Sequence, residues 1–87
     1  MSKIKTSVLA HFTFDKRVLP LKIKTEDGVT LKVDRILDMR PAASLKAGGS
    51  GIRYICDCTT YNDGDEVPVS RFRLFRDNDE WYAEVDS

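Results

Sequence analysis

The sequence has few of the residues on which metal and redox sites depend, with one His and two Cys among 87 residues. A tetrahedral structural metal site normally takes four nitrogen or sulfur ligands, and His11 lies far along the chain from Cys56 and Cys58. The two cysteines stand two apart in an alternating segment, so a strand points both to one face, where reduced thiols pack as small hydrophobes. We therefore expect neither a metal nor another cofactor.

Long apolar runs are also absent. No stretch approaches the roughly 18 residues of a membrane span, and the start MSKIKTSVLA lacks the apolar block of a signal peptide. We therefore expect a cytoplasmic protein without a membrane partner. Pro and Gly are scarce, and a chain with 41% hydrophobic and 32% charged residues has the composition of a folded domain. Its length predicts one small β domain over residues 1–87.

The net charge is zero, which excludes a strongly basic or acidic protein, but the charges are unevenly spread. Residues 1–53 carry eleven Lys and Arg against five Asp and Glu, whereas residues 54–87 carry three against nine. Such an order either builds opposite poles on one surface or neutralises itself where the two halves pair as adjacent strands. The second interpretation is the simpler one.

Alternation of apolar and polar residues predicts a series of short strands. Asp27-Gly28 and Asp63-Gly64 predict tight turns, because these pairs tolerate the positive φ that hairpins require. The apolar parity changes near Asp34 and Arg35 and again near Ser70 and Arg71, where we expect bulges. The predicted strands cover residues 4–14, 18–24, 29–40, 52–59, 67–74 and 81–85.

These strands predict an all-β fold, a small antiparallel β-barrel or strongly bent sheet of five to six strands, either SH3-like or OB-like. Pro20 and Pro68 have no N–H for a strand ladder, so we expect each at a strand edge. Residues 41–48 begin with Pro and end with Gly, the pattern of one very short helix, although an irregular loop suits this length equally well.

The segment from Pro20 to Cys56 contains VDRILD at 33–38, RPAASLKAGG at 40–49 and GIRY at 51–54. In these motifs the chain resembles a family of small bacterial β-rich proteins, whose ends also tend to carry a Trp before an alternating strand. The resemblance implies a compact β-rich domain and brings no activity with it. The segment between Thr59 and Val69 is longer and more acidic here than in that family.

The connection around residue 46 provides the candidate binding site. Glycine lets backbone N–H groups approach an anion, and Arg or Lys supplies charge and donors, so this site suits a phosphate or a nucleic-acid backbone. Exposed rings would add stacking, with Tyr61, Phe75 and Tyr82 as further candidates. The alternative is that the arginines pair with Asp34, Asp38 and Asp57. The site residues are Arg40, Lys46, Gly48, Gly49, Arg53 and Tyr54.

No catalytic motif is present, so the sequence favours a binding module over an enzyme. Edge strands at Pro20 and Pro68 accept a strand from another protein or from a second copy, with opposite charges apposed, which makes a protein partner or a homodimer the favoured hypothesis. Nucleic-acid binding through residues 40–53 is the alternative. A metal-dependent enzyme built on Asp34, Asp38 and Asp57 is the least favoured.

Overall fold

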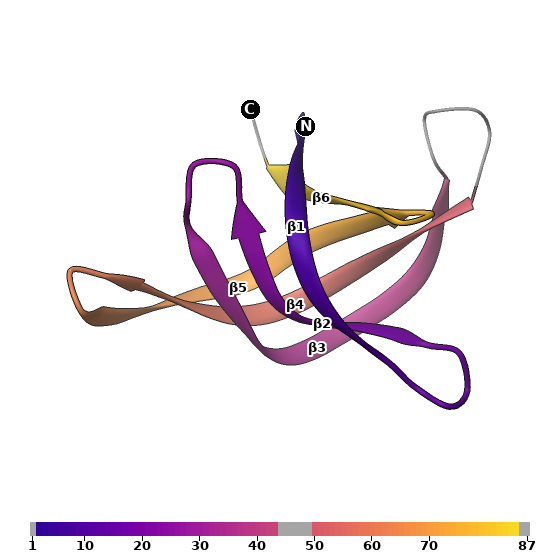
Figure 1. The fold of residues 1–87 in the computed structure, drawn as a ribbon, viewed down its shortest axis with the longest axis horizontal. Coiled ribbons are helices and arrows are strands. Elements are labelled where there is room, and N and C mark those ends of the chain that lie inside the picture. Colours follow the sequence, from indigo (N-terminus) through magenta and orange to yellow (C-terminus); the bar gives the residue numbers. More distant parts are fainter. Residues whose placement is uncertain (1, 44–49, 86–87) are drawn as a thin grey trace.

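The computed structural model describes residues 2–43 and 50–85, which form one closed antiparallel β-barrel (Figure 1). Each strand pairs with the next along the chain, and the last returns to the first. The prediction of a small all-β barrel is confirmed, and its order is up-and-down rather than the Greek key of an OB fold. The strands are β1 (Ser2–Phe12), β2 (Val18–Thr25), β3 (Thr30–Ala43), β4 (Ser50–Asn62), β5 (Asp65–Asp77) and β6 (Glu80–Val85).

The short helix is not found where the sequence predicted its start. Pro41, Ala42 and Ala43 continue β3, and Pro41 lies opposite Ile52 on β4. Pairing with β4 supplies these residues with a tertiary partner, which overrides the weak helical preference of so short a segment. The rest of the predicted helix lies outside the described residues. Within residues 2–43 and 50–85 there is no helix of the length and apolar character that a membrane crossing needs.

Both predicted hairpins are present, but their turns differ. Asp63 and Gly64 have φ values of 53° and 84°, and a positive φ at both central residues is what a type I′ turn requires. In the β2–β3 turn only Gly28 has a positive φ, 88°, and its N–H donates to the Thr25 carbonyl at 3.0 Å. This turn therefore spans three residues, with Gly28 in the left-handed position.

The predicted bulges are confirmed and explain how the sheet bends into a barrel. The β3–β4 register skips Asp34 and then Leu37, so β3 bends twice against β4. On β5 the register shift falls at Ser70 and Arg71, and Arg71 has a φ of 55°. Each extra residue increases the local twist of its strand.

The core lies inside the barrel. The rings of Tyr54 and Trp81 belong to it and lie 5.5 Å apart. Cys56 and Cys58 are free and buried, and burial raises their pKa values to about 12 and about 11, so both stay protonated. This confirms that they pack as hydrophobes. The main buried cluster is Val18, Ile23, Leu31, Tyr54, Cys56, Cys58, Leu74 and Trp81.

The barrel closes without pairing every strand along its full length. Within the described ranges, residues 65–72 of β5 pair only with β4, because β6 joins β5 from Arg73 onward. Pro68 lies in this stretch, and Pro20 lies where β2 pairs with β1 but not yet with β3. Both prolines therefore occupy strand segments with one neighbour, as predicted for edges.

Candidate functional site

The predicted anion site is brought together only in part. Arg40 on β3 lies directly opposite Arg53 on β4, and both line a shallow groove of about 350 Å³ with Asp38. Lys46, Gly48 and Gly49 lie outside the described residues. The two arginines that can be described do converge on one groove.

Both arginines are already engaged by carboxylates. The Arg40 Nε donates to Asp38 Oδ2 at 2.6 Å, as the alternative interpretation predicted. Arg53 donates from Nε and Nη2 to the two carboxylate oxygens of Glu84, at 2.8 and 3.2 Å. These bonds to Glu84 raise the pKa of Arg53. The groove therefore offers an anion little uncompensated positive charge.

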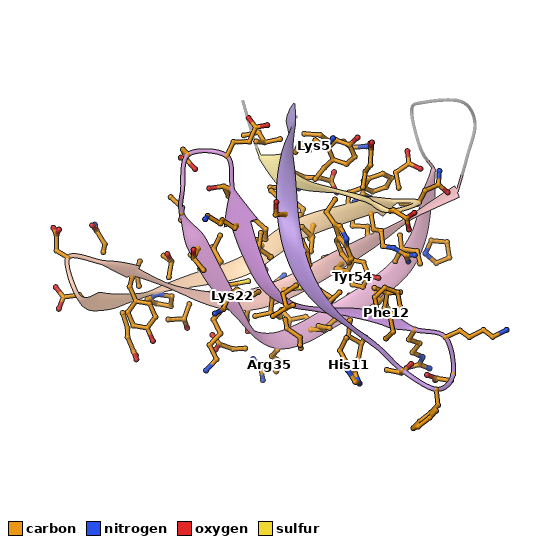
Figure 2. The ribbon with its side chains drawn as sticks, viewed as in Figure 1. Lys5, His11, Phe12, Lys22, Arg35 and Tyr54 are labelled. Carbon is orange, nitrogen blue, oxygen red and sulfur yellow. The ribbon has the colours of Figure 1, made fainter. Side chains whose placement is uncertain are left out.

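Tyr54 does not belong to a surface site. Its side chain is fully buried, and its hydroxyl donates to the Val18 carbonyl oxygen at 2.6 Å inside the barrel (Figure 2). Desolvation raises the pKa of this hydroxyl. Phe75 is buried as well, whereas Tyr61 is exposed on the β4–β5 hairpin. Of these rings, only Tyr61 lies open enough to stack on a ligand.

The three aspartates that were considered for a metal or catalytic site do not meet. Asp34 accepts a hydrogen bond from Thr59, Asp38 from Arg40, and Asp57 from Arg35 at 2.9 Å. The Arg35 bond lowers the pKa of Asp57. Across residues 2–43 and 50–85, no three His, Cys, Asp or Glu side chains are grouped as a metal ion would need.

The salt bridges also decide how the uneven charges are arranged. Arg35–Asp57, Arg53–Glu84 and Lys5–Glu80 each join a cation of the first half of the chain to a carboxylate of the second half. Two of these bridges cross paired strands and Arg53–Glu84 spans β5, so part of the positive charge of the first half is neutralised by carboxylates of the second half.

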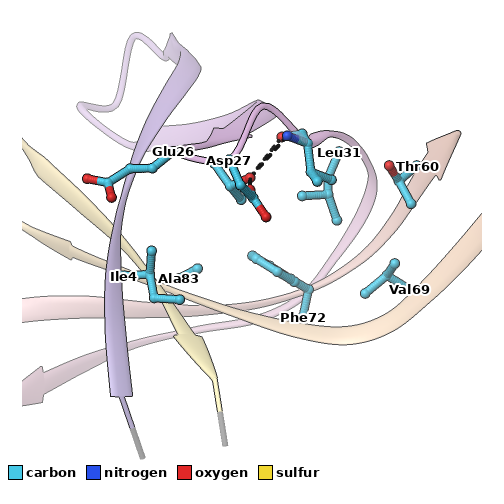
Figure 3. Close-up of a pocket in the computed structure, with 10 residues that line it drawn as sticks. Ile4, Glu26, Asp27, Leu31, Thr60, Val69, Phe72 and Ala83 are labelled. Atoms are coloured by element: carbon cyan, nitrogen blue, oxygen red, sulfur yellow. Dashed lines mark hydrogen bonds between the residues drawn. The ribbon is translucent and has the colours of Figure 1, made fainter. Parts of the chain in front are cut away.

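A second hollow opens at the mouth of the barrel, beside the β2–β3 turn (Figure 3). It has a volume of about 460 Å³, and most of its wall is apolar. Glu26, Asp27 and Thr60 lie along one side of its opening. Thr25 also lines the hollow. Barrel mouths with an apolar wall and a few polar groups are common binding sites. We call this hollow the mouth pocket; its apolar wall is formed by Ile4, Val29, Leu31, Val69, Phe72 and Ala83.

The β1–β2 hairpin carries the most exposed aromatic side chains of the described residues. Phe14 at its tip is fully exposed, and Phe12 is 72% exposed. Leu9 and Leu21, on the two strands of the same hairpin, are also exposed. The hairpin projects from the barrel at the end opposite the β2–β3 turn (Figure 1).

The tip of this hairpin is an ordered turn. The Thr13 N–H donates to the Arg17 carbonyl at 2.9 Å, and the Lys16 N–H donates to the Thr13 carbonyl at 3.1 Å. The Thr13 hydroxyl bonds to Asp15 and also accepts from the Arg17 N–H at 3.0 Å. We call Thr13 to Arg17 the aromatic tip.

The aromatic tip and the β2–β3 turn are built in the same way. Thr25 makes the same four hydrogen bonds in the β2–β3 turn as Thr13 makes in its own turn. The Thr25 hydroxyl bonds to Asp27 and accepts from the Val29 N–H. The Thr25 carbonyl accepts from the Gly28 N–H, and the Thr25 N–H donates to the Val29 carbonyl. Lys16, with a φ of 66°, stands where the other turn has Gly28. Phe14 likewise stands where the other turn has Glu26.

Sequence reasoning missed this pair of turns, although a signal was present. Thr13-Phe14-Asp15 and Thr25-Glu26-Asp27 share the pattern Thr-x-Asp, in which a Thr hydroxyl and an Asp carboxylate close a local turn. Lys16 hid the similarity, because Lys at a left-handed position is uncommon.

No family model, curated protein or solved structure matches this chain. The resemblance over Pro20 to Cys56 therefore stays a prediction.

Proposed function

We propose that this protein is a protein-interaction module and that the aromatic tip of the β1–β2 hairpin is its binding element. The observation that carries this proposal is the complete exposure of Phe14 on a turn held by its own hydrogen bonds. An exposed aromatic side chain loses the free energy of burial, which amounts to about 2 kcal/mol for Phe, unless a partner covers it.

The order of the turn supports the same proposal. Buried aromatic side chains are frequent anchors of protein interfaces, and a binding element that is already ordered loses less entropy when it binds. The bonds of Thr13 fix the backbone on both sides of Phe14. Phe12, at the end of β1 next to the tip, is also exposed and adds to the apolar surface there.

Lys16 adds a further argument from backbone strain. A non-glycine residue in the left-handed region costs roughly 1 to 2 kcal/mol, and such residues often occur at functional sites. The β2–β3 turn avoids this cost with Gly28 in the same position. A requirement for the Lys16 side chain at the binding surface explains why the aromatic tip does not use glycine.

Strand addition at an edge, the route expected from the sequence, has less support. In a hairpin closed by a two-residue turn, hydrogen-bonded and non-bonded positions alternate from the turn outward. By this alternation Glu66 and Pro68 direct their backbone groups away from β4, toward the side of β5 without a neighbour. Pro68 offers no donor there, and a proline of this kind protects an edge from pairing.

Photocrosslinking in the cells that make the protein tests the proposal. Benzoylphenylalanine replaces Phe14 in one variant and Tyr61 in a matched control, because Tyr61 is also an exposed ring on a hairpin. We expect a protein adduct from position 14, identified by mass spectrometry, and a much weaker one from position 61. Absence of an adduct at position 14, or equal labelling from both positions, would contradict the proposal.

Nucleic-acid binding is the second candidate, favoured by one groove on the outside of the barrel. Lys22 and Lys32 lie directly opposite each other on β2 and β3, and with Tyr61 they line a groove of about 540 Å³. Neither lysine has an ion-pair partner among residues 2–43 and 50–85. Like charges in adjacent positions repel each other, and a phosphate between them would relieve that repulsion.

A gel shift with short RNA and DNA at low salt tests this candidate. Binding that weakens as salt is raised, and that Lys22→Glu/Lys32→Glu removes, would support it. Arg40→Glu serves as the control, because Arg40 is paired with Asp38 in the other groove. The zero net charge of the chain counts against this candidate. No retardation at low salt would eliminate it.

A further inference from the structure

We infer that the partner of the aromatic tip is a second copy of this chain, with Phe14 of one molecule inserted in the mouth pocket of the next. This inference rests on the proposed function and names its partner. Two features of the same molecule lead to it: a fully exposed Phe14 on one hairpin, and an apolar hollow of about 460 Å³ beside another.

The chemistry of the two surfaces is complementary. The apolar wall of the mouth pocket includes Ile4, Leu31 and Phe72. Phe72 is a suitable neighbour for an inserted ring, because aromatic pairs add about 0.5 to 1.5 kcal/mol to the burial of their area. An apolar hollow of this volume has room for one benzyl side chain.

The net charges of the two surfaces are opposite, because at the aromatic tip Asp15 pairs with Arg17 and the charge of Lys16 remains. Lys16 lies two residues after Phe14 at the aromatic tip, whereas Glu26 and Asp27 lie along the opening of the mouth pocket. Within the described ranges, no ion pair occupies Lys16 or Glu26. The two turns share one backbone geometry, so they differ through their side chains. The aromatic tip has Phe14 and Lys16 where the β2–β3 turn has Glu26 and Gly28. Such complementarity orients two copies and discriminates against wrong partners.

The geometry requires the contact to be between molecules. The aromatic tip precedes β2 and the β2–β3 turn follows it, so the two surfaces lie at opposite ends of an eight-residue strand (Figure 1). At about 3.3 Å per residue this places them roughly 25 Å apart. Each molecule thus offers one tip and one pocket, and a contact between one tip and one pocket is head-to-tail, which builds open chains or a ring.

The contact is small, which sets the conditions under which it can be observed. One phenyl ring buries roughly 150 to 250 Å² of its own surface, well below the roughly 800 Å² that each partner buries in a stable interface. We therefore expect weak, salt-sensitive association that appears at high protein concentration and low ionic strength.

Sedimentation equilibrium of the full chain and two variants tests the inference. Phe14→Glu/Lys16→Gly copies the residues of the β2–β3 turn onto the aromatic tip, so this hairpin keeps a turn that the chain already folds. Glu26→Lys/Val29→Lys changes two exposed residues of the mouth pocket. We expect the wild type to exceed its monomer mass of 9.9 kDa as concentration rises. Each variant alone should associate at least roughly thirtyfold more weakly, the loss typical of an aromatic anchor.

A mixture of the two variants decides between this contact and others. The first variant keeps an intact pocket and the second keeps an intact aromatic tip, so an equal mixture should form heterodimers and nothing larger. Tyr61→Ala is the control and should associate like the wild type. A mixture that stays monomeric while the wild type associates would overturn the inference, as would association by the tip variant alone.

The same experiments separate this inference from the proposed function. A wild type that remains monomeric at millimolar concentration and low salt overturns self-association. If benzoylphenylalanine at position 14 then still yields an adduct with a different protein, the aromatic tip is a protein-binding element and only its partner was wrongly inferred. Self-adducts that disappear with Glu26→Lys/Val29→Lys support both proposals together.

Discussion

Arg53 and Glu84 form the most deeply placed ion pair among the described residues, with two hydrogen bonds of 2.8 and 3.2 Å between guanidinium and carboxylate. Glu84 is buried, with its side chain 1% exposed, whereas the Arg53 side chain is 42% exposed. The pair therefore joins β4 to β6 across β5. It gives Arg53 a structural role at the position where the sequence suggested an anion ligand.

The unequal burial predicts unequal effects of substitution. Arg53→Ala leaves a buried carboxylate without its partner, and such a change costs about 3 kcal/mol of folding free energy or more. Glu84→Gln keeps the shape of the side chain, and Arg53 remains partly exposed to water. We therefore expect this variant to lose less folding free energy than Arg53→Ala. Urea unfolding of both variants measures the difference. A larger loss from Glu84→Gln than from Arg53→Ala would contradict this account of the pair.

Tyr54 closes a part of the barrel where the strand ladder is interrupted. Its hydroxyl bonds to the Val18 carbonyl on a segment of β2 that has no pairing with β3. Tyr54→Phe leaves that buried carbonyl unsatisfied, so we expect it to lower the free energy of unfolding by about 1 to 2 kcal/mol. Tyr61→Phe, at an exposed ring, is the control and should change stability little. Equal stability of Tyr54→Phe and the wild type would show that the bond contributes nothing.

Much of the fold could be predicted from local pattern. Alternation located the strands, and the changes of parity located the bulges at Asp34 and Arg71 correctly. These features depend on neighbouring residues and on the two faces of a strand. For residues 41–43 neither the short helix nor the irregular loop suggested by their local pattern is correct, because that pattern contains no information about the pairing of Pro41 with Ile52 that holds them in β3.

The candidate site was much harder to predict. Tyr54 and Arg53 stand next to each other in the sequence, and a strand turns them to opposite faces, one into the core and the other to Glu84. The mouth pocket combines residues from all six strands with those of the β2–β3 turn, so only the closed barrel assembles it. Exposure of Phe14 likewise depends on how far the hairpin projects, which periodicity does not determine.

The buried thiols predict a loss of stability in alkaline solution. Folding raises the pKa of Cys56 from its usual 9.0 to about 12 and that of Cys58 to about 11, mainly by desolvation. Their stabilising effect is therefore fully present well below pH 9 and is lost as the pH rises through 9 toward about 11 for Cys58 and about 12 for Cys56. We expect a loss of roughly 1 kcal/mol per thiol between about pH 8 and pH 10.

Urea unfolding across that pH range measures the loss, with Cys56→Ala/Cys58→Ala as the control. The control lacks the thiols, so the part of the pH dependence that they cause should be absent from it. Equal pH dependence in both proteins, or rapid labelling of the native thiols near neutral pH, would show that the cysteines are more accessible than the barrel allows.

Lys16 predicts a stabilising substitution. Lys16→Gly removes the strain of a side chain at a φ of 66°, so we expect the free energy of unfolding to rise by roughly 0.5 to 1 kcal/mol. Gly28→Ala, at the equivalent position of the other turn with a φ of 88°, should lower it by about 1 kcal/mol. Thermal unfolding compares the two. A Lys16→Gly protein that is less stable than the wild type would contradict the assignment of strain to this residue.

The most direct test of the central claim is a dilution series of the labelled wild-type protein followed by two-dimensional amide NMR. If the aromatic tip of one copy enters the mouth pocket of another, the amide signals of residues 13–17 and those of Glu26, Val29 and Phe72 should shift together with concentration, while those of Asp63 and Gly64 stay constant. Signals that do not change with concentration, or that change at only one of the two surfaces, would contradict it.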